Sequence, residues 1–154
     1  MSVPLPVLRL PHHDPALPLP AYETVDAAGA DLRACLPEPS RAAGLTLASL
    51  DRAAIPTGLA VAVPAGFELQ VRPRSGRALR EGLSMPNSPG TVDADYRGEL
   101  MVLVVNLGRE PLVIRHGERI AQAVLCPVAR AAWTQAEALD ETARGAGGFG
   151  STGR

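Results

Sequence analysis

The 154-residue chain has no lysine, because all fifteen of its basic residues are arginine. This excludes a P-loop lysine and a Schiff-base lysine, and with them two classes of enzyme. The net charge is only −1, which gives no broad electrostatic reason to bind nucleic acid or an anionic membrane. No apolar run is long enough to span a membrane, and no charged start followed by an apolar stretch marks a leader. We therefore expect neither a nucleic-acid partner nor a membrane anchor.

Cysteine is also scarce, with only Cys35 and Cys126 in the chain. Two cysteines are too few for a disulfide scaffold, so we expect reduced thiols and a cytoplasmic location. None of the three histidines has metal-ligand spacing with either cysteine. Residues 1 to about 24 are rich in proline and leucine and are expected to be extended. His12 and His13 are interpreted as solvated residues of this N-terminal arm.

Glycine and proline are abundant, with fifteen of each, which favours many turns and short strands. From Gly58 the pattern becomes that of strands, and residues 67–72 alternate between apolar and polar as in a half-buried strand. Residues 100–105 are continuously apolar, as in a strand covered on both faces. The sequence therefore predicts an all-β sandwich or jelly roll. Its other expected strands are Leu112–Ile114 and Ile120–Leu125, after a turn at Gly117.

Three segments fall outside this strand pattern. A short helix is expected over residues 76–81, ended by Gly82. Residues 129–143 contain good helix formers and would be helical on propensity alone. The tail, residues 144–154, is nearly half glycine and is expected to be mobile when nothing is bound.

Four segments contain residues that the expected fold does not by itself require. Residues 73–76 place an arginine, a serine and a glycine at a helix start, which suits an anion, although Ser75 could serve only as an N-cap. Residues 87–98 form a turn-rich stretch with two acids and a tyrosine, and could equally be a solvated hairpin. Gln122 lies on an apolar strand as either a satisfied amide or a ligand contact. The glycine-rich tail could wrap a phosphorylated ligand, or could simply be a disordered terminus.

Taken in order, these segments resemble five motifs of the trimeric dUTPase family along nearly the whole chain. The motifs are AGADLRA (28–34), RPRSGRA (72–78), NSPGTVDADYRGEL (87–100), RIAQAVLCPV (119–128) and RGAGGFGSTG (144–153). Five ordered motifs with compatible spacing are highly specific. The second is the weakest, because Arg77 stands where the family usually has a small or aliphatic residue. That departure concerns a local contact and not the activity.

The resemblance implies a distorted β jelly roll that assembles as a homotrimer with three active sites at subunit interfaces. It divides the chain into one domain, residues 1–143, and a tail, residues 144–154, that closes over a site of another subunit. It implies that residues 129–143 yield in good part to strand and extended chain. The implied reaction is hydrolysis of dUTP to dUMP and pyrophosphate with Mg²⁺, which limits uracil in DNA and supplies dUMP for thymidylate synthesis.

The resemblance also assigns roles residue by residue. Asp93 matches the catalytic acid that holds the attacking water, and Tyr96 matches the ring that packs on the deoxyribose. Asp31 matches the acid that orders the metal through water, while Mg²⁺ is held mainly by the triphosphate. Phe149 matches the aromatic that closes over the uracil. The remaining substrate-binding positions are Arg74, Ser75, Gly76, Asn87, Gly90, Thr91, Val92, Met101, Gln122, Arg144, Gly150, Ser151 and Thr152.

Arg119, by contrast, is expected to be structural. Two rival interpretations of the motifs fit the residues less well. A dCTP deaminase shares the fold and a nucleotide pocket, but it would need a glutamate for deamination and a different hairpin. A jelly-roll binding protein without catalysis is disfavoured by the intact set of Ser75, Asp93, Gln122 and Arg144.

Overall fold

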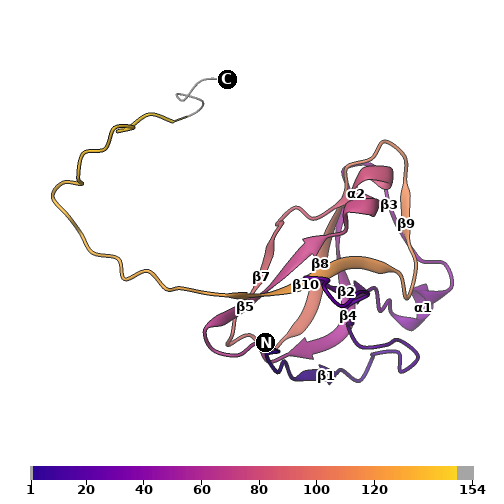
Figure 1. Cartoon of the computed structure of the whole chain (residues 1–154). Coiled ribbons are helices and arrows are strands. Elements are labelled where there is room, and N and C mark those ends of the chain that lie inside the picture. The colour runs from indigo at the N-terminus through magenta and orange to yellow at the C-terminus, as the bar shows by residue number, and fades with distance from the viewer. Residues whose placement is uncertain (1, 149–154) are drawn as a thin grey trace.

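The computed structural model of the chain describes residues 2–148, and these form a mostly β structure of antiparallel strands (Figure 1). Sheet A has the order β1-β4-β8-β6, sheet B the order β2-β10-β5-β7, and sheet C pairs β3 with β9. All three sheets enclose one hydrophobic core. This architecture matches the expected distorted jelly roll. The strand bounds are β1 Val7–Arg9, β2 Ala30–Arg33, β3 Leu45–Leu47, β4 Arg52–Val61, β5 Phe67–Pro73, β6 Leu83–Ser84, β7 Gly90–Val92, β8 Glu99–Asn106, β9 Leu112–Ile114 and β10 Arg119–Pro127.

The expected strand at residues 67–72 is confirmed as β5, whose Leu69 and Val71 are buried in the core. The strand expected at residues 100–105 exists as β8, but the expectation that both of its faces are covered is wrong for the single chain. Val102 and Val104 are fully buried, whereas Met101 is 36% and Leu103 is 39% exposed. Antiparallel sheets commonly pack on one face only, so a continuous apolar run can still have one open face.

Strands also occur well before Gly58, where the sequence showed no clear pattern. Strand β4 begins at Arg52 and pairs with β8, with an irregularity in register between Pro56 and Ala60. Strands β1, β2 and β3 lie earlier still, as does a one-turn helix, α1 (Glu38–Arg41), which was not predicted. Short strands interrupted by proline and glycine lack the length over which a period of two becomes visible.

The expected short helix is confirmed as α2 (Ser75–Glu81). It ends at Gly82, which has a φ of 75° and donates its backbone N–H to the Ala78 carbonyl at 3.1 Å. A left-handed residue at this position favours glycine, as the sequence suggested. No helix within residues 2–148 is long and apolar enough to cross a membrane.

Residues 129–143 form neither the helix that propensity favours nor a strand. They are exposed throughout, with Trp133 93% exposed, and run as extended chain away from the body after β10 (Figure 1). Most helix stability in proteins comes from packing an apolar face, and this segment has no such surface to pack on in the single chain. The tail positions Phe149, Gly150, Ser151 and Thr152 lie outside the described residues.

The N-terminal arm is attached to the body, and this corrects the interpretation of its histidines. Strand β1 pairs with residues 59–61 of β4, and Leu10 donates its N–H to the Gly58 carbonyl at 2.8 Å. His13 is only 8% exposed, and its Nδ1 has no hydrogen-bond partner within the described residues. His12 is half exposed, but its Nε2 contacts the Glu99 carboxylate at 3.0 Å. Both cysteines are free thiols, as expected.

Candidate active site

The start of α2 and the neighbouring strands β2 and β10 surround a hollow of about 460 Å³, which we call the arginine pocket. Strand β10 pairs with both β2 and β5, so that Gln122 lies opposite Asp31 on one side and Arg72 on the other. Strand β5 then leads directly into Arg74, the N-cap of α2. The pocket is lined by polar side chains and by the backbone of Gly76; the polar residues are Glu23, Asp31, Arg74, Ser75, Arg77, Arg80, Arg119 and Gln122.

Asp31 is the electrostatic centre of the arginine pocket. Its Oδ1 contacts Arg74 Nε at 2.9 Å, and its Oδ2 accepts a hydrogen bond from Arg119 Nη1 at 3.1 Å. Arg119 Nη1 also lies 3.3 Å from the Glu23 carboxylate. The two guanidiniums hold the Asp31 side chain, which is only 10% exposed, in one orientation. Arg119 thereby supports Asp31, which fits the structural role expected of it.

Gln122 is held from two sides. Its Nε2 donates a hydrogen bond to the Pro73 carbonyl at 3.0 Å, while its Oε1 lies directly over Gly29. A Cβ at position 29 would collide with that oxygen, so the glycine of the first motif makes room for the amide. Gln122 is half-buried, satisfied through one N–H, and lines the arginine pocket. The interpretation as a satisfied amide is therefore confirmed, while the contact of Gln122 with a ligand stays a prediction.

Arg77, which departs from the family pattern, has a definite structural partner set. It is only 9% exposed, and its guanidinium binds Glu81 at 2.6 Å and Glu118 at 3.1 Å. Glu81 lies one turn along α2, whereas Glu118 lies in the turn before β10. The residue therefore joins α2 to the strand that carries Gln122.

The segment expected to hold the base and the sugar forms a separate surface. Strand β7 pairs with β5, with Thr91 opposite Gln70 and Val92 opposite Leu69. Asp93 follows β7, is exposed, and lines a hollow of about 660 Å³ together with Thr91 and Asp95. This hollow shares no residue with the arginine pocket.

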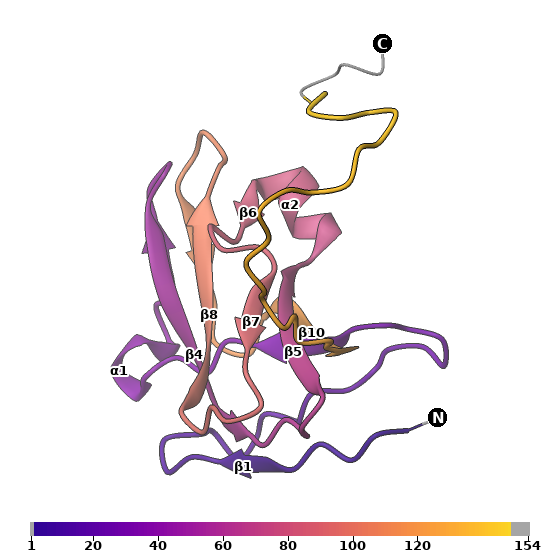
Figure 2. The same ribbon diagram turned by 90° about the vertical axis from the view of Figure 1, so that its left-hand side faces the viewer.

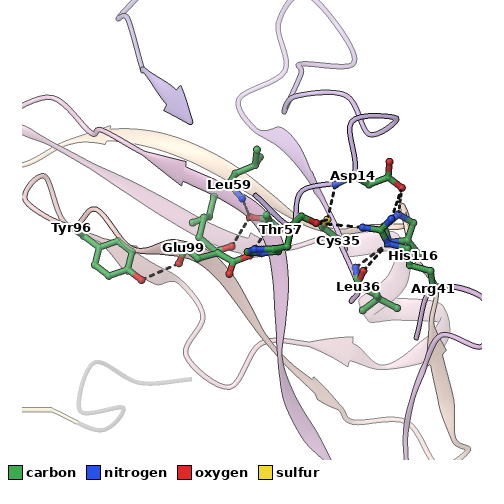
Figure 3. A network of polar contacts seen from close by, with 12 residues as sticks. Asp14, Cys35, Leu36, Arg41, Thr57, Leu59, Tyr96, Glu99 and His116 are labelled. Atoms are coloured by element: carbon green, nitrogen blue, oxygen red, sulfur yellow. Dashed lines mark hydrogen bonds and ion pairs between the residues drawn. The ribbon is translucent and has the colours of Figure 1, made fainter. Parts of the chain in front are cut away.

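Tyr96 is anchored within the same connection. Its backbone N–H donates to the Asp93 carbonyl at 3.2 Å, and its hydroxyl donates to the Glu99 carbonyl at 3.0 Å (Figure 3). The Glu99 carboxylate in turn accepts the Gly58 N–H at 2.7 Å. Tyr96 is 44% exposed, so part of this residue is accessible to a ligand. Asn87 packs against Gly90, where an added Cβ would lie 3.1 Å from Nδ2.

A single chain does not bring these two surfaces together. The stretch of β5 from Leu69 to Pro73 spans roughly 13 Å at the usual rise of a strand, and Asp93 and Ser75 lie beyond its opposite ends. Figure 2 shows α2 at one end of β5 and the connection between β7 and β8 at the other. Met101, on β8, lies outside both hollows. Arg144 is on the extended C-terminal segment, where its Nε donates to the Gly147 carbonyl at 2.8 Å.

A third polar cluster resembles catalytic machinery but is structural. The Asp14 carboxylate contacts His116 Nε2 at 3.0 Å and Arg41 at 3.3 Å (Figure 3). His116 Nδ1 accepts the Leu36 N–H at 3.1 Å, so both ring nitrogens are engaged and neither can activate a nucleophile. The backbone N–H of Ala16, and then the bond from His116, lower the pKa of Asp14 below its usual value. The cluster fastens the N-terminal arm.

The described residues contain no group of three or more His, Cys, Asp or Glu side chains that could hold a metal ion. Several residues that line the arginine pocket are not assigned to the substrate by the sequence motifs, among them Glu23, Arg77 and Arg80. Arg80 lines the arginine pocket with its guanidinium over Gly76, one helical turn earlier. The spacing of four residues from Gly76 was visible in the sequence and could have identified Arg80.

Comparisons with known proteins agree on one family. The family model described as dUTPase matches residues 16–153. A curated "Deoxyuridine 5'-triphosphate nucleotidohydrolase" of Dinoroseobacter shibae is 58% identical over 154 residues, covering 100% of this chain and 99% of that protein. A solved dUTPase variant of Staphylococcus bacteriophage 80alpha with dUpNHpp is 24% identical, with a TM-score of 0.84 over 99% of this chain and 100% of that one. A dUTPase variant of S. aureus phage phi11, described as coordinating a structural Mg(II) ion, is 21% identical, with a TM-score of 0.76 over 90% and 100%.

Proposed function

Because the chain belongs to the dUTPase family, we propose that its hydrolysis of dUTP to dUMP and pyrophosphate takes place between copies of the chain. The arginine pocket of one copy would meet the residue 90–96 hairpin of another. The separation of Asp93 from Ser75 along β5 carries this proposal. A base and a phosphate cradle acting on one triphosphate must lie within a few hydrogen-bond lengths of it, and one chain cannot provide that. A closed homotrimer supplies three equivalent interfaces of this kind.

Uracil recognition is assigned to the edge of β7. This strand ends the order β2-β10-β5-β7, so its outer backbone groups pair with no strand of the described chain. Uracil presents an N–H donor between two carbonyl acceptors, a pattern that a fixed peptide edge can distinguish from that of cytosine. Gly90, Thr91 and Val92 would provide this edge, with Asn87 supporting the turn before it. Met101, partly exposed on β8, would contribute an apolar contact.

Asp93 would activate the water. Its carboxylate is exposed beyond the end of β7 and can accept a proton as the water attacks the α-phosphorus. The bond that forms joins the water oxygen to the α-phosphorus, and the bond that breaks releases pyrophosphate. Tyr96, fixed through its hydroxyl to Glu99, would place its ring against the deoxyribose and leave no room for a 2′-hydroxyl. Arg74, Ser75, Gly76 and Gln122 would hold the phosphates from the other copy.

Mg²⁺ fits this arrangement as an ion carried by the substrate. The described residues offer no cage of three ligands, and both oxygens of Asp31 are engaged by arginines. Mg²⁺ retains several waters and binds well through phosphate oxygens, so Asp31 would reach it only through water. When bound, the ion would neutralise charge on the triphosphate. The structural Mg(II) ion described for a dUTPase variant of phage phi11 supports the choice of this metal.

The domain and its tail would have separate roles. Residues 1–143 would form the catalytic domain, and residues 144–154 would close over a site of another copy. Arg144, Ser151 and Thr152 would surround the γ-phosphate, with Phe149 and Gly150 over the uracil. The two free thiols suit the reducing cytoplasm, where we place the protein.

A nucleotide panel tests the reaction directly. We expect pyrophosphate from dUTP and far less from UTP, dCTP and dTTP, with no ammonia released from dCTP. Replacing Asp93 by Asn should leave dUTP binding nearly intact and lower turnover by roughly 10²- to 10⁴-fold, the usual loss with a general base. Wild-type turnover in this variant would move the base elsewhere, with Asp95 the first alternative. An active monomer in light scattering would contradict the shared site.

A further inference from the structure

Four arginines line the arginine pocket, and they differ in how they are paired. Three of them already contact carboxylates: Arg74 and Arg119 bind Asp31, and Arg77 binds two glutamates. The Arg80 side chain is exposed, and its guanidinium forms no ion pair or hydrogen bond with any other residue of the described chain. A triphosphate that enters this pocket carries about four negative charges. The unpaired guanidinium of Arg80 can bind it without first breaking an ion pair.

The position of Arg80 is set by the glycine of the second motif. A Cβ added at Gly76 would lie 3.2 Å from Nη1 and 3.3 Å from Nη2 of Arg80. The guanidinium therefore lies over the backbone that any phosphate in the pocket must approach. A side chain at position 76 would press against this guanidinium and shift it by a few tenths of an ångström, so glycine leaves Arg80 undisturbed over the helix start. Residues 76 and 80 are one turn apart on α2, so this placement follows from the helix itself.

We propose that Arg80 is a further substrate-binding residue, which contacts the β- and γ-phosphates and not the α-phosphate. This inference rests on the proposed function. The hairpin that holds the nucleoside and the attacking water comes from another copy, so the α-phosphate lies toward that hairpin. The β- and γ-phosphates, which are farthest from the nucleoside, therefore reach deepest over α2. A planar guanidinium can bind two phosphate oxygens at once.

The test compares two ligands that differ in these phosphates. Calorimetry on the full-length assembly would measure the Kd of dUpNHpp and of dUMP for wild type, Arg80→Gln and Arg80→Lys. For Arg80→Gln we expect dUpNHpp to bind roughly 10- to 100-fold more weakly, as for a lost charge-assisted contact, and dUMP to bind as in wild type. Arg80→Lys should recover part of the loss, because it restores the charge without the bidentate geometry. In kinetics, KM for dUTP should rise more than kcat falls.

Arg109→Gln is the matched control, because Arg109 is also exposed and lies in the loop beside α2 but does not line the arginine pocket. It should change neither Kd. Unchanged dUpNHpp binding in Arg80→Gln would overturn the proposal, as would an equal loss for dUMP, which would indicate a general effect on the site. Wild-type protein that releases no pyrophosphate from dUTP would instead overturn the proposed function. Pyrophosphate release with an unaffected Arg80→Gln variant would remove the role of Arg80 alone.

Discussion

Replacing Arg77 by leucine exchanges the buried arginine of the second motif for an aliphatic residue. In the structure the Arg77 side chain is 11% exposed, while its partners Glu81 and Glu118 are 34% and 35% exposed. Fully exposed ion pairs contribute about 0–1 kcal/mol, and hydrogen bonds to charged groups about 1.5–3 kcal/mol. The contribution of the Arg77 contacts lies between these two ranges, since both carboxylates keep access to water after Arg77 is removed.

We therefore expect Arg77→Leu to lower the free energy of unfolding by about 2 kcal/mol, because leucine preserves the packing of the stem but not the two contacts. For a chain of this size that corresponds to a fall in Tm of roughly 4–8 °C. Thermal unfolding should be compared at one protein concentration, since association shifts Tm. High salt should reduce the difference between the two proteins, because the pairs are partly exposed.

The same variant should retain kcat/KM for dUTP within about threefold of wild type, since we assign Arg77 to the scaffold. Glu118→Gln is the matched control and should also lower Tm. The double variant should lose less free energy of unfolding than the sum of the losses in the two single variants. An unchanged Tm combined with a loss in kcat/KM above about tenfold would refute this reasoning. It would mean that Arg77 serves the substrate.

Three further predictions concern the tail, the sugar and pH. A chain ended after Ala143 should keep its oligomeric state in light scattering but hydrolyse dUTP slower by on the order of 10²-fold, as for a lost closing element; full activity would remove the role of the tail. Tyr96→Ala should raise kcat/KM for UTP relative to dUTP by about tenfold or more, whereas Tyr96→Phe, which loses only the bond to the Glu99 carbonyl, should keep the preference. Burial first, and Arg9 second, lower the pKa of His13, so its stabilising effect is complete above the ordinary value of about 6.5 and is lost as the pH falls below it. Tm should therefore drop between pH 7.5 and 5.5, and less so in His13→Gln; equal slopes would show that another group is responsible.

The parts of the fold that could be predicted are those in which neighbouring residues alone determine the local structure. Strand β5 alternates cleanly over six residues, and the end of α2 needs a left-handed residue that glycine provides. Strand β4 was recognised only from Gly58, because Pro56 and the irregular register beside it disturb the pattern. The residue 129–143 segment shows the opposite failure, since its local preference for helix is clear but no surface of the single chain packs against it.

The candidate site was predictable in identity but not in placement. The motifs named Asp31, Arg74 and Gln122, and the structure brings these three together around one pocket. No sequence pattern shows that Asp93 lies at the far end of β5, because that depends on the pairing of β7. The burial of His13 is unpredicted for a related reason: it depends on the pairing of β1 with β4, which brings the proline-rich arm that carries His13 against Gly58.

The distance between the Asp93 hairpin and the Gln122 pocket also has a genetic consequence. In the proposed assembly each site takes its hairpin from one chain and its phosphate pocket from another. Two inactive proteins, Asp93→Asn and Gln122→Leu, would then complement each other when co-expressed, because the intact halves can meet across an interface. Random mixing of equal amounts should restore about one site in four. Two mutations inside the same half should restore none, so that defects in this chain would sort into two complementation groups along the length of a single strand.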